Sequence, residues 1–177
     1  MTFLKHILVL AVICSVSFVQ AKEESSKDDI KVKIENVQAQ LDELVDQGGK
    51  YAYLQLAQKN RMSPFAVGVD GKGDVIMMEV PKSEENASVS QKVLVLRDTL
   101  QKSAKKGVFE AAALFVQAEV PHLGKTVSGV AIEMEHKDGI SALRFSPYEI
   151  DRANKKIAFK QPVDKVKPVV FFKDIKK

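Results

Sequence analysis

Residues 130–150 constrain the fold of this chain more than any other segment. They read VAIEMEHKDGISALRFSPYEI, with apolar residues alternating on both sides of an Asp138-Gly139 pair. Alternation of this kind is typical of half-buried strands, and Asp-Gly strongly favours a two-residue hairpin turn. The segment therefore predicts an antiparallel β-hairpin.

A two-residue turn fixes which residues face each other across such a hairpin. Apolar side chains would meet apolar ones on one side of the sheet, and an acid would meet a base on the other side. The expected pairs are Ile132 with Phe145, Met134 with Leu143, and Glu133 with Arg144. This register explains the charges of the segment through the sheet alone, without a ligand.

Three groups that can carry chemistry, Glu133, Glu135 and His136, precede the turn. In the expected register the two glutamates share the outer face of the sheet, whereas His136 follows the side of Met134. One side of one strand does not then present all three groups to one metal ion, so we predict a structural or surface role for them. The alternative is a hydrolase or metal-dependent enzyme that uses these three residues, and it would gain support if His122 lay close enough to His136 to share a metal ion.

Helical and strand patterns follow one another along the rest of the chain. The expected elements are a helix from Ile30 that Gly48-Gly49 would stop, a short helical piece at 51–59, a hairpin at 63–80, a helix from the Ser88 capping box to Gly107, strands at 109–120, 127–136 and 140–146, and a short strand at 155–160. The order helix, two strands, helix, three strands predicts an α+β domain, an antiparallel sheet of about five strands with helices packed on one face.

The first 21 residues have the pattern of a secretory signal peptide, with a basic start, an apolar run at 7–19 and small or modest residues before a cut near Ala21. The run is shorter than the roughly 20 apolar residues that span a bilayer. A lipid anchor on Cys14 is a weaker alternative. We expect a signal peptide (1–21), a flexible leader (22–29) and a single α+β domain (30–177), periplasmic or secreted, with no membrane span after cleavage.

Composition and motifs exclude several classes of function. The only cysteine, Cys14, would leave with the signal, which removes disulfides, thiol nucleophiles and thiolate metal sites. The 27 basic and 23 acidic residues are spread along the chain, so we expect no nucleic-acid partner. The Gly-rich turn at 70–74 departs from a calcium loop, and the sequence contains no nucleophile elbow, phosphate-binding loop or zinc helix. We therefore predict no catalytic, cofactor-binding or metal residues, no cofactor and no enzymatic activity.

Two stretches resemble an uncharacterised family of small bacterial α/β proteins. They are Pro64-Phe65-Ala66 at the opening of one hairpin and the run from Glu135 to Gly139, which turns into a strand ending at Pro147-Tyr148. The element order is also similar to that of profilin-like and roadblock-like folds. That resemblance implies a binding or dimerising module and carries no catalytic residue.

These observations together predict a secreted or periplasmic non-enzymatic domain that binds another envelope protein or its own copy as a dimer. Support comes from the missing catalytic motifs and from the apolar tail at 169–172, which would be unfavourable in water. The alternative is that this tail completes the chain's own sheet or covers its own core.

Overall fold

The computed structural model describes residues 5–122, 124–151 and 156–173, with side chains from residue 30 onward. The chain divides into two compact units, Met1–Gln38 and Ala39–Lys177, and the sheet and α2 (Val89–Lys105) belong to the second. The expected signal peptide (1–21) and leader (22–29) lie outside the residues whose side chains are described, and they stay predictions. Within the described part of the chain, no helix combines the length and the apolar character of a membrane span.

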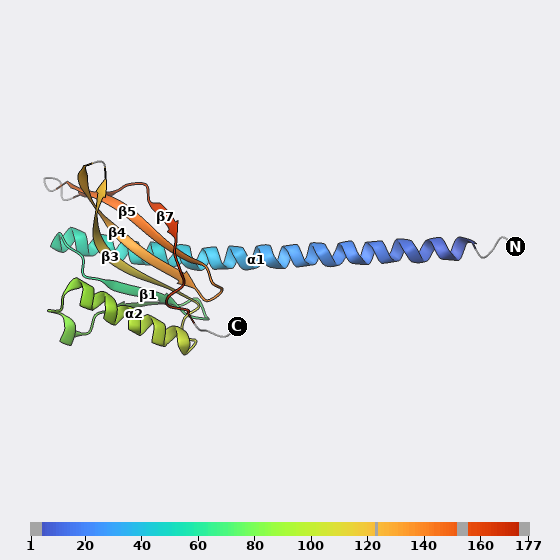
Figure 1. Ribbon diagram of the computed structural model, residues 1–177, viewed down its shortest axis with the longest axis horizontal. Coiled ribbons are helices and arrows are strands. Elements are labelled where there is room, and N and C mark those ends of the chain that lie inside the picture. Colours follow the sequence, from blue (N-terminus) through green and yellow to red (C-terminus); the bar gives the residue numbers. More distant parts are fainter. Residues whose placement is uncertain (1–4, 123, 152–155, 174–177) are drawn as a thin grey trace. The chain divides into compact units, whose positions relative to one another are not determined.

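Helix α1 (Lys5–Lys59) enters the second unit and is followed by strands and one further long helix (Figure 1). The order continues with β1 (Phe65–Val69), β2 (Val75–Glu79), the short 3-10 helix η1 (Lys82–Glu84), α2 (Val89–Lys105), β3 (Ala111–His122), β4 (Lys125–His136), β5 (Ser141–Asp151), β6 (Lys156–Phe159) and β7 (Val163–Val166). The strands form one antiparallel sheet in the order β2-β1-β3-β4-β5-β6, and β7 pairs with β5. The predicted α+β class with an antiparallel sheet is confirmed, although the described residues form more strands than the expected five.

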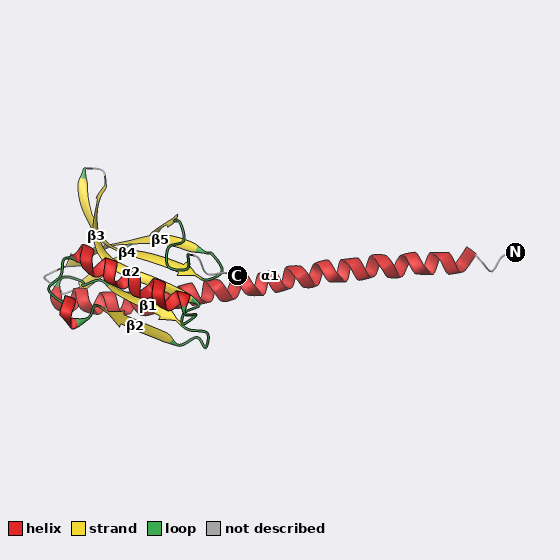
Figure 2. Cartoon of the chain, turned by 60° about the horizontal axis from the view of Figure 1, so that its bottom comes forward, coloured by secondary structure: helices red, strands yellow, loops and turns green. Residues whose placement is uncertain are grey.

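The two helices pack on opposite faces of the sheet (Figure 2). On the α1 face, Tyr51 contacts the ring of Phe65 edge-on, and Phe65 stacks on Phe115 with 4.8 Å between ring centroids in each pair. On the other face, Leu96 and Leu100 of α2 pack into a core that the sheet also lines. The prediction that helices cover one face is therefore wrong.

The sequences of the central strands explain why both faces are covered. All five residues of β1 (FAVGV) and the first five of β3 (AAALF) are buried. A strand with water on one side alternates apolar and polar residues, whereas a strand covered on both sides is apolar throughout. The middle of this sheet therefore requires a helix on each side.

Helix α1 continues through Gly48 and Gly49 to Lys59, so the predicted stop at this pair and the separate piece at 51–59 are wrong. Gly48 has a packing role instead. A Cβ atom at this position would lie 2.1 Å from Cζ of the Phe115 ring, which is fully buried. Glycine here lets the helix backbone approach the sheet closely, which is one of the common reasons for glycine inside a regular element.

The hairpin between β4 and β5 forms as predicted, but its register differs by one residue. Gly139 N–H donates to His136 O at 2.9 Å, His136 N–H donates to Ile140 O at 2.8 Å, and Gly139 has a φ of 94°. This geometry is a three-residue loop that ends on a glycine in the left-handed region, and it uses one residue more than the expected turn. The observed pairs are Ile132 with Arg144, Glu133 with Leu143 and Met134 with Ala142, so the three predicted pairs are wrong.

The predicted cap of α2 is confirmed. Ser88 and Gln91 form a reciprocal capping box in which each side chain bonds the backbone N–H of the other residue. Beyond the helix, Gly107 adopts a positive φ of 69°, as helix-terminating glycines do. Further along the chain, Phe171 and Phe172 are buried in the α2-side core, which confirms the alternative for the apolar tail. These two rings cover the chain's own core and give no support to a dimer.

Candidate functional site

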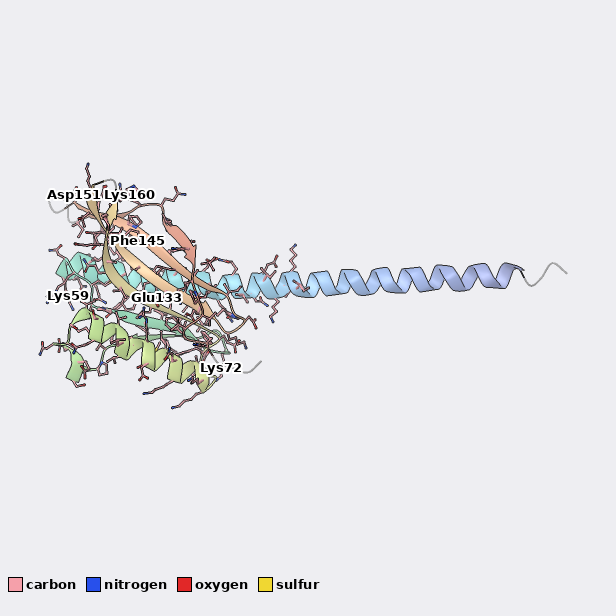
Figure 3. The ribbon with its side chains drawn as sticks, in the orientation of Figure 1. Lys59, Lys72, Glu133, Phe145, Asp151 and Lys160 are labelled. Atoms are coloured by element: carbon pink, nitrogen blue, oxygen red, sulfur yellow. The ribbon has the colours of Figure 1, made fainter. Side chains whose placement is uncertain are left out.

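The three ionisable groups before the turn, Glu133, Glu135 and His136, bond different partners. The Glu133 side chain lies on the α2 face of the sheet and forms an ion pair with Arg97 of α2 (Figure 3). Glu133 is only 17% exposed, so the face that was expected to be outer is covered by the helix. The predicted pairing of Glu133 with Arg144 is wrong. Arg144 instead makes two bonds of 2.7 Å to the carboxylate of Asp164 in β7.

Glu135 is fully buried and fastens the C-terminal segment to the sheet. Its carboxylate accepts the backbone N–H groups of Val170 at 2.8 Å, Phe171 at 2.7 Å and Phe172 at 3.3 Å. The ammonium group of Lys167 completes the set. A buried carboxylate with these partners has its charge and its lone pairs satisfied inside the fold. Glu135 therefore acts in structure, as a clamp on residues 167–172.

His136 lies on the opposite face of the sheet and is 3% exposed. Its Nδ1 accepts the backbone N–H of Asp138 at 3.0 Å. Its Nε2 lies 2.9 Å from the side-chain oxygen of Gln40 in α1. Because Nδ1 is an acceptor and the Gln40 oxygen cannot donate, the bonds fit the neutral ring protonated at Nε2. Both ring nitrogens are engaged, and neither is placed to bind a metal ion.

His122 and His136 lie at opposite ends of the β3–β4 hairpin. His136 pairs with Ala111 at one end, whereas His122 pairs with Lys125 at the other. Eleven residue steps separate positions 111 and 122, so the histidines are roughly 36 Å apart at about 3.3 Å per residue. Within residues 30–122, 124–151 and 156–173, no three His, Asp or Glu side chains gather closely enough to hold a metal ion. The condition under which an enzyme using Glu133, Glu135 and His136 would gain support is not met.

A cavity of about 340 Å³ lies between α1 and the sheet, and we call it the α1 pocket. Its apolar walls are Val45, Ala52, Tyr53, Phe115, Val130, Ile132, Phe159 and Pro162. The volume falls in the range of small-molecule sites, which are concave and mostly apolar. Tyr53 and Phe159 are each 40% exposed, so large apolar side chains face solvent at this place.

The charged residues of the α1 pocket are already paired. Lys50 bonds Asp46 at 2.6 Å, one helical turn away in α1, and this bond raises the pKa of Lys50. Lys160, labelled in Figure 3, bonds Glu149 at 2.9 Å. The pocket therefore offers apolar walls and satisfied charges to a ligand.

Gly49 of α1 leaves space free at the wall of the α1 pocket. It lines the cavity, and a Cβ atom added there would meet no atom within 4 Å. From the sequence alone, Gly49 is predicted only as part of a helix stop. The two glycines thus have different roles. Gly48 lets the Phe115 ring pack directly against the backbone of α1, and Gly49 leaves space free in the neighbouring pocket.

The α1 pocket could not be predicted from the sequence, because its apolar walls come from α1, β3, β4 and β6, which lie far apart in the chain. The available signal was the run of apolar residues in β4 combined with glycine on the facing helix. No family model matches this chain, and neither a curated protein nor a solved structure matches it.

Proposed function

We propose that this protein is a secreted or periplasmic, non-enzymatic binding domain whose ligand is a small, neutral, apolar molecule held in the α1 pocket. The observation that carries the proposal is a cavity of about 340 Å³ with apolar walls that remains open beside Gly49. Burying apolar surface in such a cavity is worth about 25 cal/mol per Å² removed from water. The binding energy would come from that burial.

The charges of the pocket favour a neutral ligand over an anionic one. Lys50 and Lys160 are the basic groups among its lining residues, and each already bonds a carboxylate. A ligand with an acidic head group would have to displace Asp46 or Glu149, and it would gain little because these pairs are exposed and screened. An apolar ligand avoids this competition.

The contacts of the three ionisable residues before the turn support a non-enzymatic role. Glu133, Glu135 and His136 bond Arg97, the segment at 167–172 and Gln40, respectively. Each contact joins two elements of the fold, and none directs a reactive group into the α1 pocket. A role in binding requires no such group.

Binding of prodan, a neutral naphthalene dye whose emission shifts to the blue in apolar surroundings, tests the proposal on the full chain. We expect saturable binding that Gly49→Leu weakens at least tenfold, because the new side chain would fill the pocket. Gly49→Ala is the matched control, since alanine and leucine have similar helix propensities but alanine fills far less space. Equal affinity in all three proteins would contradict the proposal, provided that circular dichroism shows each of them folded.

The location needs its own test, because it rests on the pattern of the first 21 residues alone. Mass spectrometry of the protein isolated from its own host should show an N-terminus near Lys22. An intact Met1 in a cytosolic fraction would refute export and leave the binding proposal standing.

A further inference from the structure

A second cavity, of about 240 Å³, lies at the end of α1, and we call it the lysine pocket. It is bordered by the last turns of α1, the residues before β1, the end of β2, η1 and the first turns of α2. A single water needs only about 10 to 15 Å³ of such space. The lysine pocket therefore has room for a polyatomic group.

Three lysines line this cavity, each from a different helix. They are Lys59 of α1, Lys82 of η1 and Lys92 of α2. Within the part of the chain that the structure describes, none of the three forms an ion pair. An anion in the hollow between these three cations would be attracted by all of them.

A buried amide supplies a second, independent feature of the lysine pocket. Gln55 lines the cavity and is 8% exposed. Its side-chain oxygen accepts the backbone N–H of Ser63 at 2.9 Å, whereas its Nε2 bonds no described residue. Gln55 Nε2 is not one of the enclosed side-chain atoms that lack a partner, so it is open to the cavity and can donate to an acceptor that lies there.

Two carboxylates share the lining and set the charge balance. Glu79 accepts the Tyr51 hydroxyl, a bond that raises the pKa of Tyr51 to about 12. Glu85 is exposed beside η1. Three lysines against two glutamates leave the lining with a formal charge of +1, and Glu79 is already engaged by a donor. The remaining donors favour an anion.

We propose that the lysine pocket binds the phosphate group of a small molecule. Its donors come from three helices and from the Gln55 amide, so they approach the cavity from several directions. A tetrahedral phosphate presents oxygens in several directions, whereas a planar carboxylate presents two oxygens in one plane. The proposal uses none of the residues of the α1 pocket, and either proposal can fail without the other.

The test is a titration of the isotopically labelled full chain with inorganic phosphate, followed by NMR at constant ionic strength. We expect saturable shifts of the Gln55 side-chain amide and of the Ser63 backbone amide. Lys59→Gln and Lys92→Gln should each weaken binding about tenfold or more, as loss of a charge-assisted hydrogen bond does. A parallel titration with glycerol 3-phosphate distinguishes an organic phosphate from free phosphate as the ligand. Tighter binding of glycerol 3-phosphate than of inorganic phosphate would assign the site to an organic phosphate.

Lys72→Gln provides the matched control. Lys72 lies in the turn that joins β1 to β2, whereas the lysine pocket lies at the open end of this hairpin, near Phe65 and Glu79; Figure 3 labels Lys72 and Lys59. This control should leave the phosphate affinity unchanged. The proposal is overturned if Lys72→Gln weakens binding as much as Lys59→Gln, if chloride reproduces the shifts, or if the Gln55 amide does not respond.

Discussion

Replacing Gly48 by alanine should destabilise the protein, whereas the same change at the next residue, Gly49, should stabilise it. Both positions lie inside α1, where alanine is favoured over glycine by about 1 kcal/mol. At Gly49 the new methyl group meets no atom within 4 Å, so the free energy of unfolding should rise by about that amount. At Gly48 the methyl group would lie 2.1, 2.4 and 2.7 Å from three carbons of the Phe115 ring.

The Phe115 ring has little freedom to avoid this contact. It is fully buried and stacks on Phe65, which itself contacts Tyr51. Overpacking of this kind costs about 1 to 3 kcal/mol. With a cost near the upper end and a gain of about 1 kcal/mol from helix propensity, Gly48→Ala should lose about 2 kcal/mol net. The two variants should then differ by about 3 kcal/mol.

Urea denaturation of the full chain, followed by far-ultraviolet circular dichroism, measures both changes. The midpoint should fall for Gly48→Ala and rise for Gly49→Ala with the slope unchanged. Gly48→Ala should cost less stability when it is added to Phe115→Leu than when it is added to the wild type, because the smaller leucine side chain leaves room for the methyl group. A midpoint for Gly48→Ala at or above that of the wild type would refute the close packing of α1 on the sheet.

Three further outcomes follow from the contacts of charged groups. Glu135→Ala should cost about 3 to 5 kcal/mol in urea denaturation, because it leaves a buried cation and three backbone N–H groups without their acceptor; a loss below about 1 kcal/mol would contradict the clamp. Ultraviolet titration should place the pKa of Tyr51 at about 12, and Glu79→Gln should lower this pKa. The bond between the Tyr51 hydroxyl and Glu79 should stabilise the fold fully below the ordinary tyrosine pKa of about 10, and this contribution should be lost as the pH rises through about 12. The bond from Arg144 lowers the pKa of Asp164. This ion pair should contribute less than about 1 kcal/mol to stability because it is exposed, and the contribution should be present above about pH 4 and lost as the pH falls through the lowered pKa of folded Asp164. Arg144→Gln should remove this part of the acid dependence of stability, and an unchanged dependence would count against the ion pair.

Local signals in the sequence predicted the elements whose causes are local. The capping box at Ser88 and the glycine at 107 mark the ends of α2, because a cap bonds residues three positions apart and a positive φ belongs to one residue. The turn at Asp138-Gly139 was also recognised. The length of the turn could not be predicted, because Asp-Gly occurs both in two-residue turns and in three-residue loops that end on glycine. One extra residue in the loop changes the partner of every residue in the hairpin.

Features that depend on distant residues could not be predicted. The sequence around Gly48 predicts a helix stop, because nothing local indicates that the Phe115 ring lies against this residue. Glu135 reads as a free carboxylate next to a histidine, yet its hydrogen-bond partners lie 35 to 37 residues further along the chain. The α1 pocket has the same origin, since its walls come from a helix and three strands that only the fold brings together. The correct part of the site prediction was that Glu133 and Glu135 share one face of the sheet and His136 lies on the other, which follows from strand alternation alone.

Methyl NMR of the full chain during a titration with prodan tests the proposed binding site most directly. Val130 and Ile132 belong to the wall of the α1 pocket, whereas Leu96 and Leu100 lie in the core on the α2 face, so the two pairs report on the two faces of the sheet separately. We predict saturable shifts of the Val130 and Ile132 methyl groups, with those of Leu96 and Leu100 unchanged. Shifts of the α2-side methyl groups, or no shift at Val130 and Ile132 at saturating dye, would contradict a binding site between α1 and the sheet.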